Sequence, residues 1–303
     1  MPDLGYRIKH FGWLKDYPSL KDYGPQDAHR RLGVGSTTEE ASVLDPGQKI
    51  GTLRALPVSV DNRKHCSPVR DQGELGSCTA FMATSMYEYM CKRGHSKYIQ
   101  LSPLFTYKST RWLMHLRGDT GAYIRSALGS LVIHGSPPEE YYPYEIRKFD
   151  REPGILQSSF AQSFQALKYF RLDKGIPSDQ TLVDRMKEYI AKGFCLGFGF
   201  TVFDSFESRD DGFVPYPKPD EEVLGGHAVM ICGYFNGDQG MPYNEDCFLF
   251  KNSWGKDWGD NGFGLIPAKY FITEEGMDAP LADDIWAITK YEWLNLGEFG
   301  FND

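Results

Sequence analysis

Residues 71–90 read DQGELGSCTAFMATSMYEYM, a glycine-containing turn that leads into a cysteine and a run of apolar and small residues. After Cys78 these residues recur at the spacing of three and four that places them on one face of a helix. Gly76 and Ser77, directly before the cysteine, are typical of a helix start and an N-terminal cap. The stretch therefore predicts an amphipathic, core-facing helix over residues 77–90.

The rest of the chain divides into a helical part and a later part rich in short β-like runs. Helix-compatible segments lie near residues 102–116, 122–134 and 180–192, and β-like runs lie at 194–203, 227–235 and 247–254. Loops rich in glycine and proline separate the β-like runs, as expected for strands joined by turns. Helices followed by strands predict an α+β fold in which a helical half packs on a β half.

Length and composition limit the class of protein. The 303 residues are 41% hydrophobic, 24% charged and 15% aromatic, which is enough apolar material for a sizeable core. The formal net charge of −8 argues against a nucleic-acid partner. No uninterrupted apolar run approaches the roughly 18 residues of a membrane-spanning helix, so no membrane insertion is expected.

The first twenty residues, MPDLGYRIKHFGWLKDYPSL, carry charges throughout and leave no room for the apolar centre of a secretory signal. We therefore expect a cytoplasmic protein or one exported by a non-standard route, unless a targeting segment has been removed. The sequence does not choose among these alternatives.

Residues 1–54 differ in composition from the rest of the chain. They hold 8 Lys and Arg against 7 Asp and Glu, so the remainder carries the acidic balance. Turn-rich stretches and few apolar residues after Leu32 indicate an extension with some order over residues 6–32, followed by a polar linker. We predict an extension over 1–54 and a main domain over 55–303. An edge strand and loop of the main domain is the alternative interpretation of the extension.

Cys78 occupies a position that stabilises a reactive thiol. At a helix N-terminus the unpaired N–H groups and the helix dipole favour the thiolate, which is the nucleophilic form. Gln72, six residues earlier, can bring a side-chain N–H to the same place. Together with the backbone N–H of Cys78, that donor would form an oxyanion hole.

Two later stretches supply the partners that such a thiol needs. GGHAV (225–229) presents His227 behind two glycines, and KNSWGKDW (251–258) places Asn252 at a strand end beside Trp254. An Asn there can fix the imidazole tautomer while the Trp excludes water, which completes a Cys–His–Asn arrangement. Taken alone, each of these residues is more often structural, as a buried thiol, a core histidine or a loop closure.

The chain resembles the papain-like cysteine peptidases, including their bacterial members, over residues 56 to about 290. The matching stretches are LPVSVDNR (56–63), SPVRDQGELGSC (67–78), TGAYIRSAL (120–128), YYPYE (141–145), GGHAVMICGY (225–234) and KNSWGKDWGDNGFG (251–264). The resemblance implies a two-lobed α+β fold, with a helical lobe packed on an antiparallel β-barrel lobe and the active-site cleft between them. It also implies hydrolysis of peptide bonds in protein or peptide substrates through a thioester. We expect no cofactor, and no metal because no pair of cysteines has the spacing of a zinc site.

The same resemblance assigns the catalytic roles. It makes Cys78 the nucleophile, His227 its general base and acid, and Asn252 the residue that orients the imidazole. Gln72 becomes the oxyanion donor, and Trp254 supports the floor of the site.

The substrate-binding residues follow from the resemblance as well. They are Gly121, Ala122, Tyr123, Ile124, Gly226, Ala228 and Trp258. The backbone of Gly121 and Ala122 would pair with the substrate. Tyr123, Ile124 and Ala228, together with Phe198, would form an apolar pocket that favours a hydrophobic or aromatic side chain two residues before the cut. Tyr123 and Ile124 as ordinary core residues are the alternative.

The chain departs from the family pattern near the nucleophile. A cysteine usually lies three residues before the nucleophile, but Leu75 stands there, and Asp119 stands where its usual disulfide partner falls. Both halves of the bridge are absent together, which indicates a coherent replacement. Thr79 replaces an aromatic residue, and Gly226 replaces the Asn or Asp that usually precedes the catalytic histidine. None of these changes removes a catalytic group.

Two other functions remain open beside a peptidase. A binding or scaffold protein could keep this fold without turnover, and a transamidase could pass the same thioester to an amine. We expect residues 1–54 to fold back over the cleft and hold the enzyme latent. The aromatic segment GYRIKHFGWLKDY (5–17) would be the anchor. A permanent structural belt is the alternative role of the extension.

Overall fold

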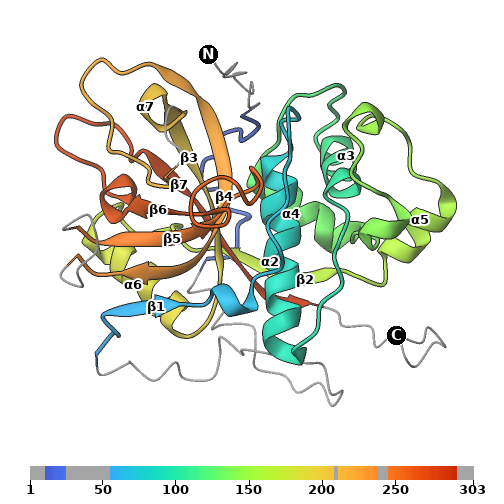
Figure 1. Cartoon of the computed structure of the whole chain (residues 1–303), viewed down its shortest axis with the longest axis horizontal. Coiled ribbons are helices and arrows are strands. Elements are labelled where there is room, and N and C mark those ends of the chain that lie inside the picture. Colours follow the sequence, from blue (N-terminus) through green and yellow to red (C-terminus); the bar gives the residue numbers. More distant parts are fainter. Residues whose placement is uncertain (1–10, 25–54, 208–210, 238–244, 292–303) are drawn as a thin grey trace.

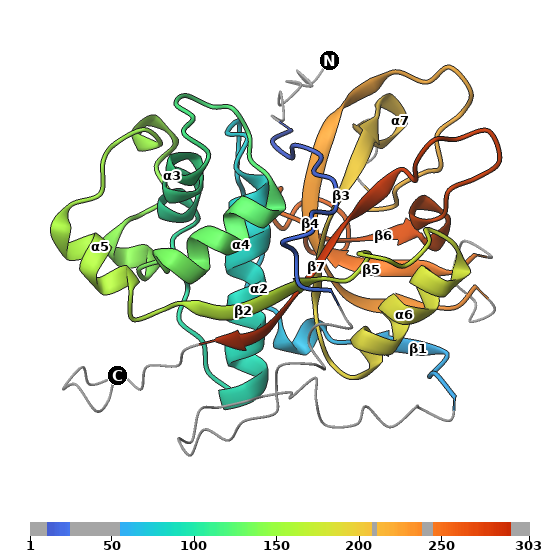
Figure 2. The same ribbon diagram turned by 180° about the vertical axis from the view of Figure 1, so that it is seen from behind.

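The computed structural model describes residues 11–24, 55–207, 211–237 and 245–291. Its longer helices gather mainly in one half and its strands in the other, and the two halves meet along a junction (Figure 1). Residues 11–24 run along that junction, between the helical half and the sheet (Figure 2). The predicted α+β architecture is confirmed.

The helical half is built around α2 (Cys78–His95), which is buried over most of its length. α3 (Pro103–Leu113) and α4 (Ile124–Ile133) pack against α2 and against each other. The hydroxyl of Ser102 caps α3 by accepting from the N–H of Phe105. The shorter helical elements in this part of the chain are η1 (Arg63–His65), η2 (Glu139–Tyr141), η3 (Ile146–Lys148) and α5 (Ile155–Ala161).

The described strands build the other half: β1 (Ser59–Asp61), β2 (Ala166–Arg171), β3 (Leu196–Phe203), β4 (Val223–Phe235), β5 (Cys247–Lys251), β6 (Phe263–Pro267) and β7 (Ala282–Tyr291). They form one antiparallel sheet in the order β2–β7–β3–β4–β5–β6, with β1 paired to β4. Among the described residues no pairing joins β2 to β6, so the sheet is open and does not close as the expected barrel. The remaining elements are α6 (Gln180–Ala191), α7 (Asp204–Glu207) and η4 (Ala268–Phe271).

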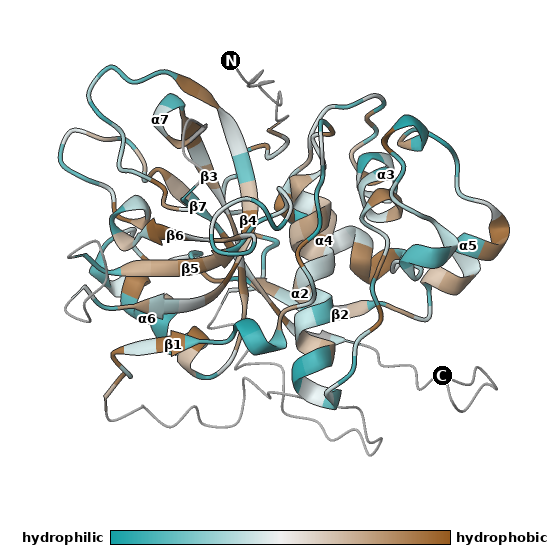
Figure 3. Cartoon of the chain, in the orientation of Figure 1, coloured by the Kyte–Doolittle hydropathy of each residue, from teal (hydrophilic) through white to brown (hydrophobic). Residues whose placement is uncertain are grey.

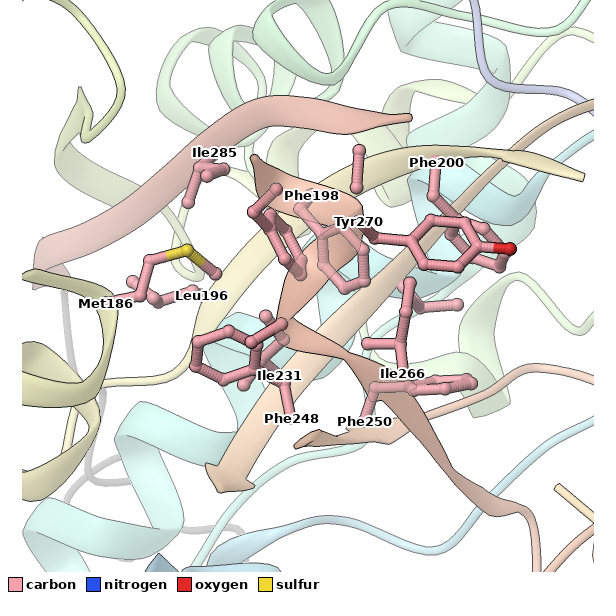
Figure 4. Packing of buried hydrophobic residues seen from close by; sticks show 14 of the residues in the cluster. Met186, Leu196, Phe198, Phe200, Ile231, Phe248, Phe250, Ile266, Tyr270 and Ile285 are labelled. Carbon is pink, nitrogen blue, oxygen red and sulfur yellow. The ribbon is translucent and has the colours of Figure 1, made fainter. Parts of the chain in front are cut away.

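Successive residues of β3 point to opposite faces of the sheet, and each face borders a different hydrophobic core. Phe198 and Phe200 point into the core between the sheet and α6, which Figure 4 shows from close by. Gly197 and Gly199 point to the opposite face, where a Cβ on Gly199 would overlap the indole of Trp13. Glycines at these positions let α2 and the N-terminal residues approach the strand closely.

The hydropathy of the residues differs between the sheet and the end of α2. Hydrophobic residues gather along β5 and β6, and hydrophilic residues cover the far end of α2 (Figure 3). No helix in the described part of the chain is long and apolar enough to cross a bilayer. All six cysteines are free and buried.

Two local features differ from the expectation. Ser77 occupies the N-cap position of α2, but its side chain makes no capping bond, because its hydroxyl pairs with the Tyr144 hydroxyl at 2.7 Å. The short strands β1 and β6 were not predicted, and neither were the longer β2 and β7. Register shifts interrupt the pairing of β2 and β7, so their side chains do not alternate regularly in the sequence.

Candidate active site

Cys78 begins α2 and its side chain is fully buried. The strap, which we define as residues 11–24, covers it. The main chain of Gly12 lies so close that a Cβ there would be 1.9 Å from the Gly76 carbonyl oxygen. Burial raises the pKa of the Cys78 thiol to about 11, while main-chain hydrogen bonds from Ala228 and Gly12 act in the opposite direction. The thiol is therefore protonated at neutral pH in this arrangement.

His227 lies on β4, and its imidazole is oriented by two neighbours. Nε2 is 2.8 Å from Asn252 Oδ1, and the ring stacks on Trp254 with centroids 4.7 Å apart. Because the amide oxygen only accepts, Nε2 carries the proton and Nδ1 is the basic nitrogen of the ring. The next residue, Ala228, hydrogen-bonds to the Cys78 sulfur, so this part of β4 lies beside the thiol.

Ser253 organises the other two predicted catalytic residues. Its N–H donates to Asn252 Oδ1 over 2.8 Å, the same atom that faces His227. Its hydroxyl donates to Gln72 Oε1 over 2.6 Å, and its carbonyl accepts from the Gln72 N–H over 2.8 Å. With its oxygen held in this way, Gln72 turns Nε2 toward the nucleophile turn and donates to the Leu75 carbonyl over 2.9 Å. Ser253 was not predicted as a site residue, although it lies within the KNSW motif.

Asp119 links two loops where the papain-like pattern has a disulfide. Its carboxylate accepts from the Gly76 N–H, at 3.1 and 3.2 Å from its two oxygens. The Tyr107 hydroxyl donates to this carboxylate over 2.6 Å and accepts from the Gly121 N–H over 3.0 Å. Leu75, at the other replaced position, is buried in the core of the helical half. A hydrogen-bonded carboxylate therefore joins the nucleophile turn to the loop before α4.

The strap is paired along both of its edges. The Ala122 N–H donates to the Gly12 carbonyl over 2.7 Å, and the Leu14 N–H donates to the Ala122 carbonyl over 3.0 Å. On the other edge, the Trp13 N–H donates to the Gly226 carbonyl over 3.0 Å. Residues 11–17 of the expected aromatic anchor thus lie in the junction, and residues 5–10 lie outside the described part of the chain.

Three of the predicted substrate-binding residues contact the strap directly. Ala122 and Gly226 pair with its main chain as described above. A Cβ on Gly121 would lie 2.4 Å from the Gly12 carbonyl oxygen, and one on Gly226 would lie 2.7 Å from the Trp13 ring. Glycine at 121, where φ is +69°, and at 226 therefore permits this close approach.

Two others are buried in the same hydrophobic cluster as Trp13. Ile124 and Ala228 are buried in the cluster that also contains Trp13 and Cys78. Tyr123 is half-buried and stands at the N-cap of α4.

The last predicted residues lie farther away. Trp258 packs edge-on against Trp254, with centroids 5.4 Å apart, and so supports the ring on which the histidine stacks. Phe198 does not line this pocket, which corrects the expectation. It lies on the other face of β3, stacked on Phe200 with centroids 5.8 Å apart.

A carboxylate that was not predicted from the sequence lies at the inner end of the pocket that Trp13 fills. The indole Nε1 donates to Asp284 Oδ2 over 3.2 Å, and both residues are buried. Lys15 pairs with the neighbouring Asp283 at 2.6 Å. The aromatic composition of the strap pointed to Trp13, whereas no local signal distinguishes the two aspartates of β7.

Comparisons with known proteins place this site in a family. A sequence model of the papain family cysteine proteases matches residues 56–275. An uncharacterized peptidase C1-like protein of Acanthamoeba polyphaga mimivirus is 35% identical over 305 residues, which cover 97% of this chain and 91% of that protein. Cathepsin B-like CP3 of Giardia intestinalis is 31% identical over 224 residues, which cover 71% of each.

A solved structure agrees with these sequence matches. Xylellain, a cysteine protease from Xylella fastidiosa, matches with a TM-score of 0.69 and 27% identity, over 94% of this chain and 97% of that one. The region that the family model matches includes the turn before α2, His227 on β4 and Asn252 directly after β5. With this fold, this arrangement and a family model that spans most of its length, the chain belongs to the papain family of cysteine proteases.

Proposed function

We propose that this papain-family protease is an endopeptidase, with its peptidase domain at 55–303, that the N-terminal extension (1–54) holds latent through the strap. The observation that carries the proposal is the main chain of Gly12 seated on the nucleophile turn, with Cys78 fully buried beneath it. The strap occupies the main-chain partners at Ala122 and Gly226 that an extended substrate needs.

The arrangement supports thioester chemistry in the open enzyme. As the Cys78 sulfur attacks the peptide carbonyl carbon, its proton passes to Nδ1 of His227. Gln72 Nε2 and the Cys78 N–H stabilise the negative charge that develops on the carbonyl oxygen. When the C–N bond breaks, the imidazolium gives its proton to the leaving amine. Water then hydrolyses the thioester and restores the thiol.

Supporting contacts hold these groups in position. Asn252 keeps the imidazole tautomer, and Ser253 fixes the oxygen of the Gln72 amide so that its N–H faces the nucleophile turn. Trp254 covers one face of the imidazole and shields its hydrogen bond to Asn252 from water. The oxyanion donor and the base are thus pre-oriented before a substrate arrives.

The strap suppresses activity in two ways. It blocks the approach to the sulfur, and its coverage contributes to the burial that raises the pKa of the Cys78 thiol to about 11. Removing it would admit both substrate and solvent. A more solvated thiol ionises more readily, so opening would restore access and nucleophilicity together.

The test compares two glycines of the strap in the full-length chain. Gly12→Ala forces a Cβ into the Gly76 carbonyl, whereas the nearest atom to a Cβ on Gly24 is a Lys174 side-chain carbon at 3.4 Å. Labelling of Cys78 by a cysteine-directed epoxide is followed by intact mass. We expect Gly12→Ala to be labelled about 10- to 100-fold faster than the wild type, and Gly24→Ala to resemble the wild type.

A Cys78→Ala chain is the control for labelling at other cysteines. Equal labelling of Gly12→Ala and the wild type would remove the latency proposal and keep the enzyme. Absence of labelling and of peptide cleavage in folded Gly12→Ala protein would contradict the peptidase itself.

A further inference from the structure

The pocket filled by Trp13 has apolar walls and an acidic inner end. The indole lies against Gly199 and Gly226, where a Cβ on Gly199 would be 2.0 Å from the ring. Ala228 belongs to the same buried cluster. At the inner end, the indole N–H donates to Asp284 Oδ2 over 3.2 Å, and Asp284 is fully buried. The pocket therefore combines apolar walls with a hydrogen-bond acceptor, Asp284 Oδ2, at its end.

A bulge in β7 aims Asp284 into this pocket. β7 pairs Trp286 with Gly197 and Asp283 with Gly199, so it contains one residue more than β3 in this stretch. Asp284 has φ +57°, a left-handed conformation that costs energy in a residue with a side chain. Bulges of this kind re-aim side chains beside functional sites. The fold thus accepts local strain to place a carboxylate at this point.

One oxygen of Asp284 faces the strap, and the other faces the body of the enzyme. Oδ1 accepts from Trp286 Nε1 over 2.7 Å and lies 3.1 Å from Arg171 Nη1. Arg171 is engaged with Asp173 as well, through Nε at 2.9 Å and Nη2 at 3.0 Å. Within the described residues, Oδ2 is contacted by the Trp13 indole. When the strap leaves, this oxygen loses its donor.

The strap brings a cation to the same region. Lys15 lies two residues after Trp13, on the same side of an extended chain, and pairs with Asp283 at 2.6 Å. Asp173, Asp283 and Asp284 form an acidic cluster whose guanidinium partner, within the described body of the enzyme, is Arg171. Departure of Lys15 therefore leaves an excess of negative charge at the inner end of the pocket.

A second arginine nearby faces elsewhere. Arg125 lies over the ring of Trp286, with 5.7 Å from its guanidinium carbon to the ring centroid. It pairs with Asp16 at 2.5 Å and Asp22 at 2.8 Å, which belong to the later part of the strap. It therefore meets a different part of the bound chain from Asp284.

We propose that this pocket selects a substrate side chain with an apolar stem and a cationic, hydrogen-bond-donating end, above all arginine, and that Asp284 determines the preference. The inference rests on the proposed function, in which a substrate main chain replaces the strap along Ala122 and Gly226. One of its side chains then enters where Trp13 lies.

The chemistry of the pocket favours arginine over apolar side chains. An arginine stem packs along the glycine wall while its guanidinium donates to Oδ2 in a charge-assisted bond. A leucine or phenylalanine leaves the buried carboxylate without a donor, which penalises its binding. The walls alone favour a hydrophobic side chain, as the sequence suggested, and the acidic end changes that expectation.

The first test uses the full-length Gly12→Ala chain as the opened enzyme. Fluorogenic peptides that differ in one residue, Arg, Leu or Phe, are scanned across the positions before the scissile bond. At one position we expect kcat/KM for Arg to exceed that for Leu and Phe by about 10- to 100-fold. A preference for Leu or Phe at every position would overturn the proposal.

A second substitution separates specificity from structure. Asp284→Asn in the same background should bring the Arg-to-Leu ratio of kcat/KM close to one. The exposed Asp278 offers a matched control, and Asp278→Asn should keep the original ratio. A purely structural role of Asp284 would lower cleavage of both peptides in parallel and leave the ratio unchanged, and that result would overturn the assignment.

A third measurement needs no turnover, because residue 13 is itself a tethered ligand of the pocket. Deuterium uptake of residues 11–24 is compared among full-length wild type, Trp13→Arg and Trp13→Leu. We expect Trp13→Arg to protect the strap about as well as the wild type, and Trp13→Leu to exchange about tenfold faster. Equal or better protection by Leu would contradict the proposal.

These outcomes keep the two proposals apart. If the folded Gly12→Ala chain neither cleaves a peptide nor is labelled at Cys78, the peptidase function fails. The strap measurement still decides what the pocket prefers.

Discussion

The two halves of the strap are held by different forces. Residues 11–14 rely on main-chain hydrogen bonds and apolar contact, and Trp13 is only 7% exposed. Residues 15–24 add ion pairs to a main-chain hydrogen bond from the Arg171 N–H to the Tyr23 carbonyl. Arg125 pairs with Asp16 and Asp22, and Lys15 pairs with Asp283. Leu20, in this second half, is 99% exposed.

We infer from this difference that residues 11–14 cover the site and residues 15–24 regulate how readily the strap leaves it. In the proposed latent state the first half covers Cys78 and prevents reaction, but apolar burial and main-chain bonds respond little to solution conditions. The second half touches no catalytic residue, yet its ion pairs are the contacts that salt and charge substitution weaken. We therefore expect release to begin in residues 15–24 and to become productive only when Trp13 leaves its pocket.

The largest effect should come from emptying the pocket. Trp13→Ala removes a buried indole together with its bond to Asp284, so strap opening should increase on the order of 10²–10³-fold. Epoxide labelling of Cys78 in the full-length chain measures this opening. Leu20→Ala, in the exposed part of the strap, should leave the rate unchanged. A similar rate for both variants would show that the first half does not dominate.

A smaller effect should follow from removing the ion pairs that hold residues 15–24. Arg125→Gln removes the partner of Asp16 and of the buried Asp22, so opening should rise about tenfold. Arg147→Gln is the matched control, because Arg147 is 83% exposed and pairs with Glu145 in its own loop. An Arg125→Gln effect as large as that of Trp13→Ala would remove the distinction between the halves.

Salt should act on the same contacts without any substitution. Raising sodium chloride from about 0.05 to 0.5 M should speed labelling of the wild type by about two- to threefold, because salt weakens these partly exposed ion pairs. In Arg125→Gln the response should be reduced, and in Trp13→Ala opening should already be complete. A wild-type rate independent of salt would contradict the role given to residues 15–24.

The smallest effect concerns Asp284 of β7, the charged partner of Trp13 in the first half of the strap. Burial raises the pKa of its carboxyl from 3.8 to about 7. The folded state then holds the proton more tightly, so this group's contribution to stability is present below about pH 4 and is lost as pH rises to about 7. Asp284→Asn should flatten the dependence of Tm on pH across that window by about 5 °C. Asp278→Asn should retain the wild-type slope.

The residues proposed to be catalytic could be singled out from the sequence because their chemistry demands particular residue types within short motifs. Cys78 at a helix start, His227 behind two glycines and Asn252 in KNSW were each marked by their immediate neighbours. The structure brings His227 and Asn252 together at 2.8 Å and places Ala228 against the thiol. Trp13 was included in the expected anchor for the same reason, as part of a local concentration of aromatic residues.

The remaining features depend on contacts between distant segments. Asp284 faces the pocket because of a register shift between β3 and β7, which no pattern within β7 indicates. Phe198 was assigned to the pocket, but the neighbouring Gly199 is the residue that faces it. A shift by one residue along a strand exchanges the two faces, so an error of one position moves a side chain to the wrong side of the sheet. The open sheet likewise follows from pairing over long range. Sequence motifs thus identify reacting groups better than they identify the surfaces around them.

The carboxylate of Asp119 has a consequence for the medium in which the enzyme works. A cysteine nucleophile needs reducing conditions, and the same thiol reagents cleave accessible disulfides. Here the nucleophile turn is joined to the loop before α4 through hydrogen bonds from Gly76 and Tyr107 to Asp119. Reductant can therefore keep Cys78 in its working form without loosening the wall beside it. Hydrogen bonds to Asp119 hold the turn and the loop together, and a thiol reductant does not break hydrogen bonds.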